Sequence, residues 1–196
     1  MNRRMSLKQY RGLDLFFFAL MLVISETVIV LAATRWFPGQ LYTVSVTAAI
    51  TAIVLMRWGP WAGIHAAVGG FVYCLVSGAE GSQYIIYCIG NLLSLLALLP
   101  LRLMGGERIR GDALYSMGFA LCVQLLMQLG RAIVAMLLLR AAVGQALAFF
   151  TTDALSDLFS MVIVWIARRL DGMFENQVNY LLRIQKQGED ERSGFQ

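Results

Sequence analysis

The sequence predicts an all-α fold, a polytopic helical bundle in a membrane, and three observations support this fold class. Hydrophobic residues make up 59% of the 196-residue chain and charged residues 14%, against roughly 45–50% and roughly 25% in soluble domains. Apolar stretches of near-spanning length recur along the chain. Basic residues gather between alternate stretches, as they do in the cytoplasmic loops of membrane proteins.

Six apolar stretches are expected to form transmembrane helices, with both termini in the cytoplasm. They cover residues 13–36, 41–56, 61–77, 84–103, 114–139 and 148–167. The second and third stretches are short, so a four-span bundle is the main structural alternative. Merging these two would place Arg57 inside the membrane with no obvious partner, which is costly. The sequence therefore predicts a six-helix domain over residues 1–170, in a bacterial cell membrane.

The positive charges support both the number of spans and their orientation. Only Arg35 and Arg140 fall in outer connections and Arg131 within a span, which leaves 13 of the 16 Lys and Arg in inner segments. Short cytoplasmic loops carry such an excess. Because the net charge of +4 follows the topology, it is not taken as a sign of nucleic-acid binding.

The polypeptide changes character after the sixth stretch. Residues 171–187 are expected to form an amphipathic cytoplasmic helix, because Phe174, Val178, Leu181 and Leu182 recur at helical spacing among polar residues. Such a helix lies on the inner membrane surface or against a partner. Residues 188–196 are polar and are expected to be disordered.

Ionisable and amide side chains inside the apolar stretches are the informative residues, because a charge at mid-membrane costs about 2.5–3.5 kcal/mol. At a rise of about 1.5 Å per residue, most of them lie roughly 10–15 Å below the outer surface. Thr43, Ser45 and Thr47 add hydroxyl groups nearby. We therefore expect a polar pocket that opens outward. Its candidate substrate-binding residues are Glu26, Asn91, Gln128, Arg131, Asp153 and Asp157.

The alternative is a closed internal network in which Glu26 or Asp157 neutralises Arg131. One cation faces up to three carboxylates, so an excess carboxylate would be protonated or would attract a cationic group on a substrate. Aromatic rings near the outer surface would either stack on a flat ligand or anchor the helices at the interface. These rings are Tyr42, Tyr73, Tyr84 and Tyr87.

Other features predict packing rather than chemistry. His65 is expected to be a buried packing histidine, and Gly59, Gly63 and Ala67 allow a close helix contact, within this chain or with another subunit. The sequence has no Walker loop, GxSxG, HExxH, paired-cysteine or dinucleotide motif. We therefore expect no enzyme activity, no catalytic residues, no cofactor and no metal site.

Two segments carry a family resemblance, residues 53–62 (IVLMRWGPWA) and 149–156 (FFTTDALS). Together with the size, the six spans and the outward polar cluster, they resemble the substrate-specific (S) components of energy-coupling factor transporters, of an uncharacterised clostridial type. The resemblance covers about residues 10–170. It implies a membrane-embedded binding subunit for a vitamin or trace nutrient, working with a transmembrane coupling protein and two cytoplasmic ATPases. Residues 19–23 (ALMLV) lack the spaced alanines that this family often has on helix one.

Two other functions remain open at this point. A structural membrane scaffold resembling the rod-shape-determining membrane protein D has a similar size and span number, and it would use the polar cluster only for internal pairing. A small ion-coupled carrier would use Asp157 or Glu26 to take up a proton. This carrier is less favoured, because the chain lacks clear repeated halves.

Overall fold

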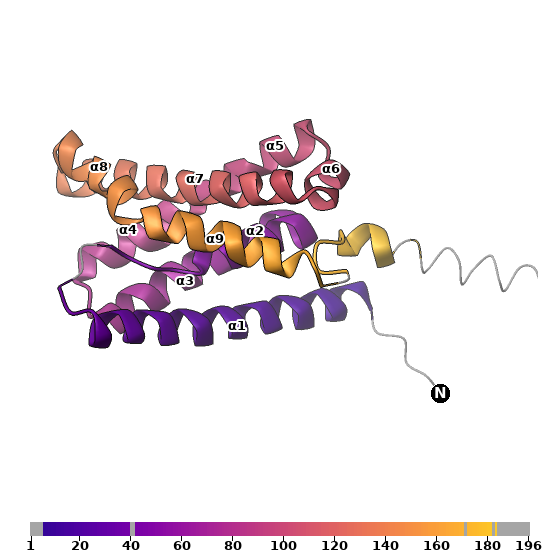
Figure 1. Ribbon diagram of the computed structural model, residues 1–196, viewed down its shortest axis with the longest axis horizontal. Coiled ribbons are helices and arrows are strands. Elements are labelled where there is room, and N and C mark those ends of the chain that lie inside the picture. Colours follow the sequence, from indigo (N-terminus) through magenta and orange to yellow (C-terminus); the bar gives the residue numbers. More distant parts are fainter. Residues whose placement is uncertain (1–5, 40–41, 171, 182, 184–196) are drawn as a thin grey trace, which may run out of the picture.

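The computed structural model describes residues 6–39, 42–170, 172–181 and 183, and this part of the chain is helical without a strand. Five helical segments are long and apolar enough to cross a membrane, which is consistent with a membrane bundle (Figure 1). The elements are α1 (Leu7–Trp36), α2 (Thr47–Trp58), η1 (Gly59–Trp61), α3 (Ala62–Ser77), α4 (Gly81–Asn91), η2 (Leu92–Ala97), α5 (Leu98–Leu103), α6 (Gly106–Gly111), α7 (Ala113–Leu139), α8 (Val143–Thr152) and α9 (Ala154–Ala167).

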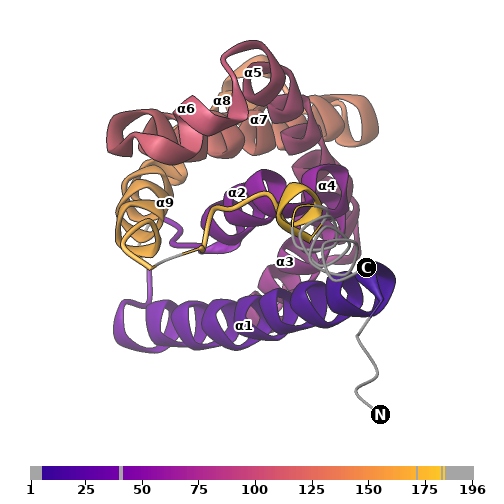
Figure 2. The same cartoon turned by 90° about the vertical axis from the view of Figure 1, so that its right-hand side faces the viewer.

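The short helix α2 forms the centre of the bundle. It lies between α1, α3, α7 and α9 (Figure 2), and all twelve of its residues are buried. Its sequence, TAAITAIVLMRW, has no charged residue until its last turn and mostly apolar residues on every face, as a helix with neighbours on all sides requires. Twelve residues span about 18 Å, less than the hydrocarbon core of about 30 Å.

The chain reverses direction between α2 and α3. Gly59 has a φ of +61°, and Pro60 occupies the first turn of the 3₁₀ helix that follows, where its missing N–H costs nothing. The close approach of Thr47 and Gly69 confirms the reversal, since a Cβ added to Gly69 would lie 2.8 Å from the Thr47 Cβ. In one straight helix these residues would be about 33 Å apart. Thr47–Ser77, one of the five long apolar segments, is therefore a helical hairpin.

The prediction of an uninterrupted helix over residues 41–56 is wrong. Residues 42–46 are not helical, and α2 begins only at Thr47. The last predicted span, 148–167, is also interrupted. Its helix begins earlier, at Val143, and breaks at Asp153 into α8 and α9. Both interruptions lie in the half of the bundle that holds the polar residues.

Both ends of the described chain lie at one end of the bundle (Figure 1). We call the end where α1 begins the inner end and the opposite one the outer end, after the predicted orientation. Which compartment each end faces stays a prediction. Glycines allow α4 and α7 to come into close contact. A Cβ added to Gly90 would lie only 2.6 Å from the backbone nitrogen of Arg131. The prediction for His65 is confirmed: it is buried, with its Nε2 3.0 Å from the Leu15 carbonyl oxygen.

Arg57 lies at the inner end of α2 and is buried rather than exposed in a loop. Its Nε and one terminal nitrogen donate to the two carboxylate oxygens of Asp14, at 3.0 and 2.9 Å. Its other terminal nitrogen donates to the carbonyl oxygens of Gly172 and Met173, both at 2.9 Å. The sequence found no obvious partner for Arg57 in the case where the second and third stretches form one span, and the structure shows that Asp14 of α1 is available as a partner.

The segment after α9 folds back onto the inner end. Phe174 is buried in the main core, and the chain is helical at residues 177–181 and 183. Val178 stays exposed. The predicted amphipathic helix is therefore shorter at its start than 171–187, and its first apolar residue packs on the bundle itself. Residues 171, 182 and 184–187, and the tail 188–196, lie outside the described residues.

Candidate functional site

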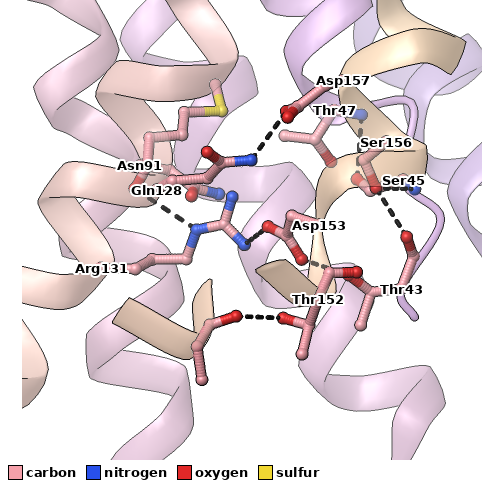
Figure 3. Close-up of polar contacts among 12 residues, drawn as sticks. Thr43, Ser45, Thr47, Asn91, Gln128, Arg131, Thr152, Asp153, Ser156 and Asp157 are labelled. Atoms are coloured by element: carbon pink, nitrogen blue, oxygen red, sulfur yellow. Dashed lines mark hydrogen bonds and ion pairs between the residues drawn. The ribbon is translucent and has the colours of Figure 1, made fainter. Parts of the chain in front are cut away.

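An ion pair between Arg131 of α7 and Asp153 is the centre of the polar cluster (Figure 3). The Arg131 terminal nitrogen lies 2.6 Å from the Asp153 carboxylate, and their side chains are only 7% and 3% exposed. Arg131 Nε also donates to the Met127 carbonyl oxygen at 3.3 Å. The guanidinium carbon lies 5.0 Å from the centre of the Tyr87 ring, within cation–π range. The closed-network alternative had proposed Glu26 or Asp157 as the partner of Arg131, and this pairing is wrong.

The break between α8 and α9 allows Asp153 to reach this position. Residue 153 ends α8 with φ −93° and ψ 3°. The Thr43 N–H donates to the Thr152 carbonyl oxygen at 2.9 Å, and the Thr43 hydroxyl donates to the Asp153 carboxylate. The helix break and the non-helical segment 42–46 therefore satisfy each other's polar groups.

Ser156 completes the contact between α9 and the 42–46 segment. Its hydroxyl donates to the Thr43 carbonyl oxygen at 2.9 Å and accepts from the Ser45 N–H at 3.1 Å. Non-helical backbone at membrane depth is tolerated only where protein groups pair it. Thr43 and Ser45 therefore contribute backbone groups to the site as well as the hydroxyl groups that the sequence predicted.

Glu26 of α1 caps the central helix. It is fully buried, and its Oε2 accepts from the Val46 N–H at 2.9 Å, where α2 begins. An anion is favourable there because the N–H groups and dipole of a helix point outward at its N-terminus. Within the described residues, no Lys or Arg lies within ion-pair distance of Glu26.

Two amide side chains join neighbouring helices beside the ion pair. Gln128 of α7 donates to the Asp157 carboxylate of α9 at 2.7 Å. Asn91, at the end of α4, donates to the Ala66 carbonyl oxygen of α3 at 3.1 Å. The Oδ1 of Asn91 and the Oε1 of Gln128 are buried and have no hydrogen-bond partner in the described part of the chain. Both orphaned atoms are acceptors.

The structure brings five of the six candidate residues together, and places Glu26 at the start of α2 (Figure 3). The polar centre encloses a void of only about 10 Å³, enough for about one water molecule. The outward-opening pocket that the sequence predicts is therefore closed in this conformation. The void is lined by Thr43, Ser45, Thr47, Gly69, Gly70, Tyr73, Tyr87, Asn91, Gln124, Met127, Arg131 and Asp153.

A second cavity, of about 230 Å³, lies at the outer end, between the ends of α1 and α3. Phe37 and Tyr42 contribute aromatic walls, and Thr43 and Tyr73 line this cavity as well as the inner void. Tyr73 stacks on Tyr87, with ring centres 4.8 Å apart. Thr43 and Tyr73 therefore separate the outer cavity from the polar centre.

Three contributors to the site were missed from the sequence. Ser156 follows Asp153 by three residues, a spacing that would place both on one face of a continuous helix. Gly90 and Gly130 each come directly before a polar site residue, and this adjacency was the available signal. A metal site would need several converging ligands, and the described residues hold no group of three or more His, Cys, Asp or Glu side chains that could bind one.

No protein-family model, curated protein or solved structure matches this chain. The chemistry of the site itself therefore carries the functional conclusion. Buried charged and amide groups from α4, α7 and α9, together with the α8–α9 junction, converge on one point beside a cavity at the outer end.

Proposed function

We propose that the protein is the membrane-embedded substrate-binding subunit of an energy-coupling factor type uptake transporter, specific for a vitamin or similar small nutrient. The observation that carries the proposal is the buried polar centre next to the 230 Å³ outer cavity. A purely structural bundle core gains little from buried ion pairs, because well-packed apolar residues are often equally stabilising.

The polar centre has more carboxyl groups than cationic groups among the described residues. Arg131 is matched by Asp153, whereas Asp157 and Glu26 have hydrogen-bond donors but no cationic partner among the described residues. The orphaned atoms of Asn91 and Gln128 are acceptors. A ligand that donates hydrogen bonds or carries a cationic group would complete this site.

The outer cavity supports a small, partly aromatic ligand. Its volume of about 230 Å³ is slightly below the roughly 300–1,000 Å³ typical of drug-sized ligands. The stacked rings of Tyr73 and Tyr87 offer a flat surface between the cavity and Arg131. In this proposal the ligand reaches the polar centre when the 42–46 segment moves aside at Thr43.

The proposal includes six passes through a bacterial cell membrane, with the inner end facing the cytoplasm. The second pass would consist of the 42–46 segment and α2, buried from lipid by the surrounding helices. A transmembrane coupling protein and two ATPases would bind from the cytoplasmic side. The excess of basic residues at the inner end supports this orientation.

The water-sized void and the paired Arg131 and Asp153 also favour a second candidate, a structural membrane scaffold with a closed core. Co-purification distinguishes the two. The C-terminally tagged protein is extracted gently from its native membrane, and mass spectrometry identifies the retained proteins and small molecules. The transport proposal expects a small polar compound together with a coupling protein and two ATPases. Cell-wall or cytoskeletal partners without such a compound would contradict it and support the scaffold.

Binding of the retained compound to the purified protein then tests the site. Glu26→Gln keeps an oxygen that accepts from the Val46 N–H but removes the charge, and Arg131→Met removes the cation. Each is expected to weaken binding at least about tenfold, the effect of losing one charged contact. Glu107→Gln makes the same change on an exposed carboxylate at the inner end and should not alter binding. Unchanged binding in both site variants would disprove the site.

A further inference from the structure

A cavity of about 370 Å³ lies at the inner end of the bundle, opposite the polar centre. Three arginines from three separate segments line it: Arg110 of α6, Arg168 directly after α9, and Arg183 of the C-terminal segment. Leu170, Met173 and Phe174 form apolar parts of the wall, and Glu107 and Glu175 are the acidic residues. The lining thus combines a surplus of positive charge with an apolar surface.

The arginines keep hydrogen-bonding capacity for a further ligand. Arg110 donates to the Met56 carbonyl oxygen at 2.8 Å, but its Nε is buried and has no partner in the described ranges. Its contact with Glu107 is long, at 3.6 Å, and the Glu107 side chain is 93% exposed. Arg168 donates to the Gly111 carbonyl oxygen and has no acidic partner among the described residues. Arg183 pairs with Glu175 at 2.5 Å.

The position of the cavity indicates the kind of anion. The apolar helix α9 ends at Ala167, so Arg168 lies where the hydrocarbon core would give way to lipid head groups. Exposed Leu170 adds apolar surface next to it. Basic pockets between helices at this level bind the head groups of anionic lipids, and the arginine fork matches phosphate oxygens in geometry and charge.

We propose that this inner-end cavity binds the phosphate head group of an anionic phospholipid, with Arg110 and Arg168 as its main donors. Phe174 and Leu170 contact the glycerol and the first methylene groups of the lipid. The ligand chemistry is a phosphate ester, and the apolar wall favours a lipid over free phosphate. The site is independent of any ligand at the polar centre.

The test uses the full-length protein in an uncharged detergent, and follows its thermal unfolding as lipid is added. Phosphatidylglycerol is expected to raise the melting temperature in a saturable way, because a ligand that binds only the folded state stabilises it. Phosphatidylcholine, which is zwitterionic, should raise it less. Arg168→Gln should weaken the apparent phosphatidylglycerol affinity at least about tenfold. Arg102→Gln removes an exposed arginine at the same end, outside the cavity, and should keep the wild-type affinity.

A second variant leaves every charge in place. Asn179→Trp puts a bulky side chain at an exposed position of the cavity lining, and it should remove the phosphatidylglycerol effect as Arg168→Gln does. An equal loss in Arg102→Gln, or an undiminished effect in both cavity variants, would overturn the proposal. Inorganic phosphate is the remaining comparison. If it reproduces the shift and competes with phosphatidylglycerol at the same concentration, the cavity is a free-phosphate site rather than a lipid site.

Discussion

The described part of the bundle contains two arginine–aspartate pairs within the helix packing, one at the inner end and one in the outer half, and their surroundings differ. At the inner end, Arg57 uses both sides of its guanidinium group, donating to the two oxygens of Asp14 and to two backbone carbonyl groups. Asp14 also accepts from the Trp58 indole N–H at 2.5 Å. In the outer half, Arg131 makes one ion pair with Asp153 and one longer bond to a carbonyl oxygen.

The two pairs differ in how many of the hydrogen-bonding groups around them have a partner. The inner pair ties α1, α2 and the segment after α9 together, and nearly all of its donors are occupied. The outer pair lies beside a small void and two orphaned acceptors, those of Asn91 and Gln128. An ion pair with saturated partners acts as a structural connection, whereas one with unsatisfied neighbours has capacity to bind a ligand.

The largest expected effect comes from breaking the saturated pair. Arg57→Met leaves the partly exposed Asp14 without its cation and two carbonyl oxygens without donors. Removing one partner of a buried pair costs about 3–5 kcal/mol. Because the Asp14 side chain is 18% exposed, the free energy of unfolding should fall by an amount near the lower end of that range. Unfolding in detergent micelles measures it. Arg102→Met, at an exposed arginine of the same end, should change it by less than about 0.5 kcal/mol; a similar loss in both would contradict the distinction.

Neutralising both partners of a pair should affect the stability of the protein differently for the two pairs. The double variant Arg131→Met with Asp153→Asn is expected to have a free energy of unfolding within about 1 kcal/mol of wild type, because replacing both charges also removes the cost of desolvating them. Arg57→Met with Asp14→Asn should remain at least about 2 kcal/mol less stable, since the Gly172 and Met173 carbonyl oxygens still lose their donor. Equal stabilities of the two double variants would remove the basis of the comparison.

The outer pair depends on the close approach of α4 and α7. A Cβ on Gly130 would lie 2.8 Å from the Gly90 carbonyl carbon, so Gly130→Ala should push the helices apart and cost about 1–3 kcal/mol. Gly118→Ala, on the same helix, meets no atom within 4 Å and should be neutral or slightly stabilising. Thermal unfolding of the two variants gives the comparison. If Gly130→Ala left the stability unchanged, the position of Arg131 on α7 would not depend on the close contact between α4 and α7.

The smallest effect is expected at Thr43. Thr43→Val removes the hydroxyl that donates to Asp153 but keeps the backbone N–H bond to Thr152. The loss of one hydrogen bond predicts a destabilisation of about 0.5–1.5 kcal/mol in the unfolding free energy. If Thr43 separates the outer cavity from the polar centre, ligand association should also change in rate, as stopped-flow measurements with the retained compound would detect. A stability loss above that range would instead make the hydroxyl part of the structural connection.

Hydropathy alone placed most of the helices, because the preference of a side chain for lipid or water is a local property. The predicted stretch 114–139 matches α7, and the end of the first stretch coincides with the end of α1 at Trp36. The common depth of Asn91, Arg131 and Asp157 was also readable, since the helical rise is constant. The helix breaks could not be predicted from the sequence, because the polar groups that a break leaves free are paired by residues from distant segments.

Composition and the spacing of polar residues were enough to predict a helical membrane bundle and most members of its polar cluster. The tertiary structure alone decided that Arg131 pairs with Asp153 and that Asp14 receives Arg57. It also decided that α2 starts only at Thr47, where Glu26 supplies its cap. The physical reason is that pairing depends on how helices rotate and where they break, and both are set by contacts between residues as much as 116 positions apart.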